Sequence, residues 1–318
     1  MLTGTRLFFA TDVHGSDRWL RKFVNAGPFY KAQVLVLGGD VAGKMMIPIV
    51  EQGNHSYRAK FLGKDWTVSN GKELTDLQTR INTSGYYHFL TTESEMSEMQ
   101  ANPAIADKKF TALMVDTMKA WLDLAEQHLK PKGIKMYITG GNDDPKEVLE
   151  VLEKSSYVQF AESRVVAVDE KHEMVSSGYS NITPWHCPRD ISEEELLAKI
   201  DEEASKVKNM STCVFNMHCP PFGTLLDQAP ELDDELRPVK KGGHVHMINV
   251  GSKAVRSAIE KYQPMIGLHG HIHESKAVDK LGKTLCINPG SEYTEGTLRG
   301  VIVNLSNNGF ESYALISG

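Results

Sequence analysis

The stretch RLFFATDVHG, residues 6–15, decides the fold class that the sequence predicts. Arg6 to Thr11 is a short and mostly apolar run, which is typical of a strand buried on both faces. A carboxylate and an imidazole follow the strand directly, in Asp12-Val13-His14-Gly15, and an amphipathic pattern from about Ser16 predicts a helix. Open α/β sheets place their functional sites at the carboxyl ends of such strands, so Asp12 and His14 are candidate site residues.

Four further polar clusters stand at the ends of predicted strands in the same way. Each follows a short apolar run, and helical patterns separate most of the runs. This alternation of short strands and amphipathic helices favours mixed sheets covered by helices, which is the α/β class. The clusters and the strands that precede them are Asp40 after residues 33–37, Asn142 after 135–139, His218 after 212–217, and His271 with His273 after 264–268.

Length and composition exclude several classes of protein. With 318 residues, 41% hydrophobic and 24% charged, the chain can bury a large core, which excludes a disordered or fibrous protein. The formal net charge of −6 argues against nonspecific nucleic-acid binding, which depends on a basic surface. No apolar run reaches membrane-spanning length, so no membrane association is expected. The four cysteines lack zinc-site spacing and predict reduced thiols, and hence a cytoplasmic protein.

The stretch from Lys44 to Lys132 interrupts the alternation of strands and helices. Its first part predicts a small meander, with turns at Gly53-Asn54 and Gly63-Lys64. Its second part predicts a helix from about Asp107 to Leu129. No Pro- or Gly-rich linker brackets the stretch, so we interpret residues 1–318 as a single domain with an insertion at about 44–132. The pattern leaves open whether the insertion caps the site or makes a dimer contact.

The polar clusters combine the side chains that bind zinc, iron or manganese. Imidazole nitrogens and carboxylate oxygens are ligands for these metals, and the lack of thiolates in the set argues against a structural zinc site. In the pairs Asp12/His14 and His271/His273, two-residue spacing on an extended strand end directs both side chains to one side. For any one residue, hydrogen bonding to a loop backbone is an equally good explanation. The complete ordered set points to a metal site.

The order of the motifs resembles the calcineurin-like metallophosphoesterase superfamily, from Asp12 to Ser291. The shared motifs are Asp12-Val13-His14, Gly39-Asp40, Gly141-Asn142, His218, Gly270-His271-Ile272-His273 and Asn288-Pro289-Gly290-Ser291. In residues 180–185 and 226–238 the chain is similar to predicted phosphoesterases related to cyclic-nucleotide phosphodiesterases. The resemblance implies an α/β fold, a four-layer α/β/β/α sandwich of mixed sheets, here with an inserted meander-plus-helix segment.

The resemblance also implies two bound divalent metal ions, with Mn, Fe, Ni and Zn as candidates, and a metal-bridging hydroxide as the nucleophile. The enzyme it implies is a metal-dependent phosphoesterase, with phosphodiesters favoured over monoesters as substrates. Asp40 would bridge the two metals. Carried over position by position, the other ligands would be Asp12, His14 and His273 for the first metal, and Asn142, His218 and His271 for the second.

One position departs from the family pattern, because Asp143 stands where the family has a His after the Asn. That His assists the leaving group, whereas a carboxylate beside two dications stays ionised and is a poor proton donor. We therefore expect a preference for phosphodiesters with good leaving groups. Alternatively another group donates the proton, and His186 and His269 are the candidates by loop position. Loop position also suggests contacts to a small phosphoester substrate, such as a nucleotide, from Asn181, Trp185 and Arg189.

Two other functions stay open at this stage. One is a metallophosphoesterase-like scaffold with weak or no catalysis that acts in protein interaction, which Asp143 favours and the complete ligand set opposes. The other is a nuclease, which the net charge of −6 opposes. The sequence does not decide whether the chain forms a homo-oligomer.

Several motifs imitate parts of the set. Gly53-Asn54-His55 lies too soon after Asp40 for a crossover helix and a strand to intervene, so we interpret it as a hairpin turn. We interpret Gly243-His244-Val245-His246 as a solvent-facing or substrate loop. Gly38 to Lys44 imitates a phosphate-binding loop, but Met45 replaces the Ser or Thr that binds magnesium there. Asp144 is expected to cap the helix that follows it.

Overall fold

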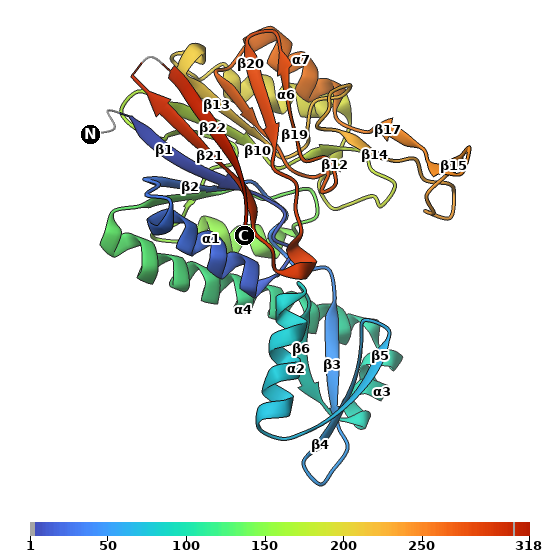
Figure 1. Ribbon diagram of the computed structural model, residues 1–318. Coiled ribbons are helices and arrows are strands. Elements are labelled where there is room, and N and C mark those ends of the chain that lie inside the picture. Colours follow the sequence, from blue (N-terminus) through green and yellow to red (C-terminus); the bar gives the residue numbers. More distant parts are fainter. Residues whose placement is uncertain (1–3, 308) are drawn as a thin grey trace.

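The computed structural model describes residues 4–307 and 309–318, and it contains two six-stranded mixed sheets packed face to face (Figure 1). The first sheet has the order β22 (Gly309–Ser317), β21 (Arg299–Ser306), β1 (Thr5–Ala10), β2 (Val34–Leu37), β7 (Lys135–Ile138) and β8 (Gln159–Phe160). The second has the order β19 (Ala277–Leu281), β20 (Thr284–Asn288), β18 (Ile266–Leu268), β13 (Cys213–Met217), β10 (Glu173–Ser177) and β9 (Val165–Ala167).

Alternate side chains of each strand fill two different apolar layers. Leu7 and Phe9 of β1 point between the two sheets, whereas Phe8 and Ala10 point toward the outer helices. Both layers are buried, which explains why β1 is a continuous apolar run rather than an alternating pattern. The layer between the sheets also contains Val34, Val36, Tyr137, Val214, Ile266, Leu268 and Ile287.

Helices cover the outer face of each sheet. Buried side chains of α1 (Asp17–Phe29), α4 (Pro103–Leu129) and α5 (Lys146–Glu153) form one cluster with the first sheet. Those of α6 (Glu193–Ala204) and α7 (Lys253–Tyr262) form another with the second sheet. The order helix, sheet, sheet, helix is the predicted four-layer sandwich, which is therefore confirmed.

Part of the chain segment that connects β2 to β7 forms a smaller unit, which projects from the sandwich (Figure 1). Its sheet has the order β5 (Lys64–Ser69), β4 (Ser56–Phe61), β3 (Met46–Glu51) and β6 (Tyr87–Thr91), accompanied by α2 (Lys72–Thr83) and α3 (Glu93–Ala101). Ile49, Phe61 and Leu77 belong to a hydrophobic cluster within this smaller unit, which is separate from the clusters of the sandwich. The predicted meander is β3 to β5, and β6 adds a strand that the sequence pattern does not predict.

Helix α4 differs from the expectation for the insertion. Met114, Met118 and Trp121 pack in the core of the main sandwich, together with Trp19 and Phe23 of α1. Much of the long predicted helix therefore belongs to the main body, where it covers the first sheet. The projecting unit itself is formed by the elements from β3 to α3.

The projecting unit is seated closely on the sandwich beside His14. The N–H of Gly43 donates to the Tyr87 hydroxyl at 2.7 Å, and a Cβ on Gly43 would lie 2.4 Å from the carbonyl oxygen of Gly85. A Cβ on Gly85 would in turn lie 2.4 Å from the carbonyl oxygen of His14. Glycine at these positions allows the backbones to approach closely, so the unit has a defined place next to the polar clusters.

The remaining elements are short. Three two-stranded ladders pair β11 (Ser180–Asn181) with β12 (Asp190–Ile191), β14 (Gln228–Pro230) with β17 (Met247–Asn249), and β15 (Lys240–Lys241) with β16 (His244–Val245). Three 3-10 helices are η1 (Lys130–Lys132), η2 (Met210–Thr212) and η3 (Tyr293–Glu295). Within residues 4–307 and 309–318, no helix has both the length and the apolar character needed to cross a membrane. The four cysteines are unpaired.

Candidate metal centre

The loops that follow the parallel strands bring the predicted ligands together. β1, β2 and β7 are parallel in the first sheet, as are β13 and β18 in the second, and the polar clusters follow their carboxyl ends. Six of these side chains form two groups, and within each group the ligand atoms lie within 4.8 Å of one another. The first group is Asp12, His14, Asp40 and His273, and the second is Asp40, His218 and His271.

In the first group, two ring nitrogens and two carboxylates converge. His14 Nε2 lies 3.1 Å from His273 Nε2 and 3.5 Å from Asp40 Oδ2. Asp12 Oδ1 lies 3.5 Å from His273 Nε2. The ring of Tyr293 packs against both imidazoles, with centroids 4.6 Å from His14 and 5.7 Å from His273. This set of donor atoms could hold one divalent metal.

The second group shares Asp40 with the first. Asp40 Oδ1 lies 3.4 Å from His218 Nε2, whereas Oδ2 faces His14, so one carboxylate serves both groups. Asn142 adds a neutral oxygen, because its Oδ1 lies 3.0 Å from His271 Nδ1. The structure thus brings all seven predicted ligands to one place, with Asp40 between the two groups.

Neighbouring hydrogen bonds fix which atom of each side chain faces the centre. The Nδ1–H of His218 donates to the Gly38 carbonyl at 3.0 Å, which leaves Nε2 for a metal. The Asn142 amide nitrogen donates to Asp190 Oδ1 at 2.9 Å, which turns the amide oxygen toward His271. Among the described residues, His218 Nε2 is buried without a hydrogen-bond partner. A buried, unpaired imidazole nitrogen facing carboxylates fits a divalent metal ion.

The backbone that carries the ligands is not extended, which corrects the spacing argument. Asp12, His14, Asp40 and His271 have φ values of 59°, 40°, 49° and 67°, in the left-handed region that non-glycine residues rarely adopt. These turns direct His271 to the second group and His273 to the first, so both side chains reach the same centre but face different groups of ligand atoms. Such strain is concentrated at functional sites, where surrounding contacts hold it in place.

Burial and charge set the protonation of the cluster. Burial lowers the pKa of His218, but the carboxylates of Asp40 and Asp12 outweigh it and raise the pKa to about 9. Burial lowers the pKa of His14 to about 3, and burial with the charge of His218 lowers that of His271 to about 4. Burial raises the pKa of Asp12, but the hydrogen bond and charge of His273 outweigh it and lower the pKa to about 2. Ionised carboxylates and neutral imidazoles are the forms that bind metal.

Asp143, at the position of the family's His, is paired with a lysine. Lys44 Nζ lies 2.9 Å from Asp143 Oδ2, and the Asp143 N–H donates to Asp40 Oδ1 at 3.1 Å. The side chains of Lys44 and Asp143 are 48% and 24% exposed, so the pair stands at the mouth of the centre. Lys44 is not among the residues predicted for the site, although its position four residues after Asp40, in a glycine-containing turn, is a signal for it.

The loop with the candidates Trp185 and His186 borders the centre. Trp185 is 62% exposed and His186 is exposed beside it. The next residue, Cys187, lies near Asp143 and Asp190, and burial together with these carboxylates raises the pKa of its thiol to about 12. The proton-donor role of His186 and the substrate contact of Trp185 stay predictions.

Asn181 is tied to its surroundings through both atoms of its amide. Its Nδ2 donates to the Val250 carbonyl at 3.3 Å, and the Cys219 thiol donates to its Oδ1 at 3.1 Å. Its predicted substrate contact also stays a prediction.

His269 corrects another expectation, because its ring is fully buried and its Nδ1–H donates to the Met217 carbonyl at 2.9 Å. A ring in this position supports the fold and does not reach a leaving group, so the donor role predicted for His269 is wrong.

Arg189 has a structural position, and its predicted contact with substrate is wrong. Its side chain is 7% exposed, and its guanidinium pairs with the buried Glu162 and donates to the Gly141 carbonyl at 2.8 Å. The guanidinium also stacks over the Tyr179 ring at 4.3 Å. The Arg189 N–H donates to the Asn142 carbonyl at 3.1 Å, so Arg189 holds the loop that carries this ligand.

Asp144 holds the same loop in a way that the helix-cap prediction does not describe. Helix α5 has Pro145 as its N-cap and has no side-chain cap, so the predicted cap is wrong. The Asp144 carboxylate is buried and accepts backbone N–H hydrogen bonds of 2.7 to 3.0 Å from Val41, Ala42 and Gly141. It therefore joins the loop after β2 to the loop after β7, the loops that carry Asp40 and Asn142.

Two of the three look-alike motifs contribute no ligand to the two groups, whereas the third, Gly38 to Lys44, contains Asp40. Gly53, Asn54 and His55 form the turn between β3 and β4, all with positive φ, so the predicted hairpin is confirmed. The motif Gly243-His244-Val245-His246 lies in and directly after the β15–β16 hairpin. There His244 is exposed, and His246 Nδ1 lies 2.6 Å from Glu231 Oε2.

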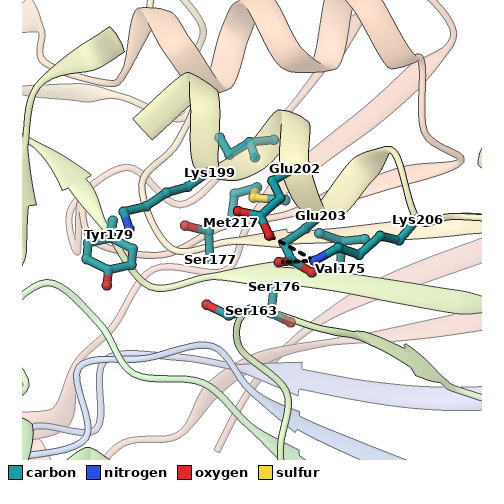
Figure 2. Close-up of a pocket in the computed structure, with 11 residues that line it drawn as sticks. Ser163, Val175, Ser176, Ser177, Tyr179, Lys199, Glu202, Glu203, Lys206 and Met217 are labelled. Atoms are coloured by element: carbon teal, nitrogen blue, oxygen red, sulfur yellow. Dashed lines mark hydrogen bonds and ion pairs between the residues drawn. The ribbon is translucent and has the colours of Figure 1, made fainter. Parts of the chain in front are cut away.

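A hollow of about 200 Å³ lies between β10 and α6 (Figure 2). Ser177, Lys199 and Met217 are among the residues that line it. Lys206 forms ion pairs with Glu202 and Glu203 at its edge, at 3.2 and 2.9 Å. None of the seven predicted ligands lines this hollow, so it is not the substrate site of the centre.

Solved structures share the fold. One crystal structure matches over 98% of both chains, with 15% identity and a TM-score of 0.56. The protein TT1561 of Thermus thermophilus matches over 99% of both chains, with 11% identity and a TM-score of 0.50. A dimetal phosphatase from Danio rerio matches over 99% of both chains, with 10% identity and a TM-score of 0.46.

The sandwich and the paired His/Asp groups agree with the fold and the ligand arrangement that the resemblance to the calcineurin-like metallophosphoesterase superfamily implies. No family model matches the chain. The chain is 33% identical over 174 residues to the uncharacterized protein MJ1162 of Methanocaldococcus jannaschii, across 54% of this chain and 71% of that protein. It belongs to the family of MJ1162.

Proposed function

We propose that the protein is a two-metal phosphoesterase that hydrolyses small phosphodiesters. The observation that carries the proposal is the position of Asp40, whose two carboxylate oxygens face two separate groups of ligand atoms. Two divalent cations, when bound, lower the pKa of water and neutralise charge on the phosphoryl group. The proposed ligands besides Asp40 are Asp12, His14 and His273 for one metal, and Asn142, His218 and His271 for the other.

The side chains of this centre are arranged before a substrate binds. Buried Asp12 and Asp40 supply the negative charge that holds cations, and the amide of Asn142 adds an oxygen without adding charge. A site with more metal charge than ligand charge attracts an anionic phosphoester. The hydrogen bonds from His218 and Asn142 to neighbouring groups hold the ligand atoms in place, which reduces the reorganisation needed for catalysis.

Among phosphodiesters, those with good leaving groups are the proposed substrates because of Asp143. Its carboxylate pairs with the Lys44 cation at 2.9 Å and does not replace the proton donor that a His would provide. Leaving groups that depart without a proton, such as aryl oxides, suit such a site. We further propose that the exposed Trp185 stacks on an aromatic part of the substrate, such as a nucleobase.

Hydrolysis of two synthetic esters tests the proposal. The protein is stripped with a chelator, reloaded with Mn²⁺, Fe²⁺, Ni²⁺ or Zn²⁺, and assayed with bis(4-nitrophenyl) phosphate and 4-nitrophenyl phosphate. We expect metal-dependent turnover that is faster for the diester. With aryl phosphodiesters that differ in leaving-group pKa, we expect the rate of Asp143→His to depend less on that pKa than the rate of the wild type. Two bound metals without turnover of either ester would contradict the proposal and favour a scaffold that acts in protein interaction.

A further inference from the structure

Lys44 and Asp143 form an ion pair beside the centre, and neither residue is one of the seven proposed metal ligands. Lys44 Nζ and Asp143 Oδ2 are 2.9 Å apart, and the Asp143 N–H donates to Oδ1 of Asp40 at 3.1 Å. The pair therefore stands directly beside the carboxylate that the two groups share. About half of the Lys44 side chain is exposed, so its ammonium is accessible from the mouth of the centre.

The backbone that leads to Lys44 is held on two sides. The buried Asp144 carboxylate accepts hydrogen bonds from the N–H groups of Val41 and Ala42 at 2.8 to 3.0 Å. The Gly43 N–H donates to the hydroxyl of Tyr87, in the projecting unit, at 2.7 Å. The position of the ammonium is thus set by a fixed turn and by Asp143, and it is not that of a freely moving surface lysine.

The charge of Lys44 acts on the centre. Burial lowers the pKa of Lys44, but the carboxylates of Asp143 and Asp40 outweigh it and hold the pKa above its usual range. The ammonium therefore stays charged. After burial, the Lys44 charge is the next influence that lowers the pKa of His14. Two divalent cations bound at the centre would repel the Lys44 ammonium, and an anion that contacts both the ammonium and the cations would offset this repulsion.

We propose that Lys44 binds a phosphoryl oxygen of the substrate and that Asp143 is the positioning residue that holds the Lys44 ammonium in place. This inference rests on the proposed function, because the anion is the phosphoryl group that the centre would hydrolyse. An ammonium is a compact point charge with three donors, which suits a phosphoryl oxygen. Lys44 and Asp143 together would take the place of the family's single His, with a cation that binds the phosphoryl group in place of an acid that donates a proton.

Binding of inorganic phosphate tests this role without any turnover. The Mn²⁺-loaded protein is titrated with phosphate in a calorimeter, and metal content and melting temperature are measured for each variant. We expect Lys44→Met to weaken phosphate binding about 10- to 100-fold at unchanged metal content, and Lys44→Arg to restore part of the loss. The matched control is Lys60→Met, which removes an exposed lysine of β4 and is expected to leave phosphate binding unchanged.

A second comparison separates positioning from direct contact. Asp143→Asn is expected to weaken phosphate binding in the presence of Lys44 and to have no effect in the Lys44→Met background. Equal phosphate affinity in wild type and Lys44→Met would overturn the proposal, as would a wild-type protein that binds no phosphate. The proposed function fails separately: if neither ester is hydrolysed but Lys44→Met still loses phosphate binding, the assignment of Lys44 stands.

Discussion

Replacement of Glu162 by Gln is expected to destabilise the protein by about 3 to 5 kcal/mol, although Gln has nearly the same shape. Glu162 and Arg189 are 4% and 7% exposed and form an ion pair. Loss of the carboxylate charge would leave the guanidinium buried beside groups that cannot neutralise it, such as the carbonyl of Gly141. This large loss of free energy of unfolding comes from the uncompensated buried charge. The net contribution of the intact ion pair to the free energy of unfolding is smaller.

Urea unfolding followed by circular dichroism measures this difference in the free energy of unfolding. The matched control is Glu153→Gln, which breaks an exposed ion pair with Arg164 at 3.3 Å and is expected to cost less than about 1 kcal/mol. The double variant Glu162→Gln/Arg189→Met removes both buried charges and is expected to recover part of the loss. If Glu162→Gln lowers the free energy of unfolding no more than Glu153→Gln does, the structural role of Arg189 is refuted.

Three further predictions concern protons and close packing. Metal binding at about pH 7.5 is expected to release at least about one proton, because His218, with its pKa raised to about 9, must lose a proton before Nε2 can bind, and, against the lowering effect of burial, the carboxylate of Asp12 also raises the pKa of His273. Calorimetric heats that do not depend on the ionisation enthalpy of the buffer would contradict this. Burial lowers the pKa of His269 from 6.5 to about 4, so the unfolded chain takes up a proton over that range while the folded protein does not. Between about pH 7 and pH 4 the wild type is therefore expected to lose about 3 kcal/mol more stability than His269→Asn in urea unfolding, and equal losses would oppose the assignment. Gly141→Ala is expected to lose bound metal, because a Cβ at this position would lie 1.9 Å from Asp40 Oδ1. The control Gly53→Ala is expected to keep its metal, because no atom lies within 4 Å of a Cβ placed there. Equal metal content in the two variants would contradict this prediction.

The sequence predicts the fold and the composition of the centre because both depend on strand ends. The buried part of a strand such as β1, from Leu7 to Ala10, is apolar, and the polar residue that follows the strand marks the edge of the sheet. Five such ends in a fixed order carry the family resemblance that implies the sandwich, and they bring Asp12, Asp40 and His218 together. The sequence does not predict the left-handed backbone at Asp12, because hydrophobic periodicity carries no information on φ.

Other features depend on contacts between distant parts of the chain. The role of Arg189 depends on Glu162, and that of Asp144 on the loop after β2, and neither partner can be identified from local patterns. The apolar periodicity of helix α4 predicts a helix, but it does not show that the helix packs on the sandwich and not on the projecting unit. Lys44 lies in a glycine-containing turn four residues after Asp40, which places it near the centre, but its pairing with Asp143 depends on a contact between distant parts of the chain.

The number of metal ions bound per chain tests the central claim most directly. Protein loaded with Mn²⁺ and freed of excess metal by gel filtration is analysed by mass spectrometry of the metal, for wild type, Asp40→Asn and His273→Ala. Two ions are expected in the wild type, one in His273→Ala, and a marked loss at both sites in Asp40→Asn, because Asp40 is the only residue common to the two groups among the described residues. A wild type that binds one ion or none, or an Asp40→Asn variant that still binds two, would contradict a two-metal centre bridged by Asp40.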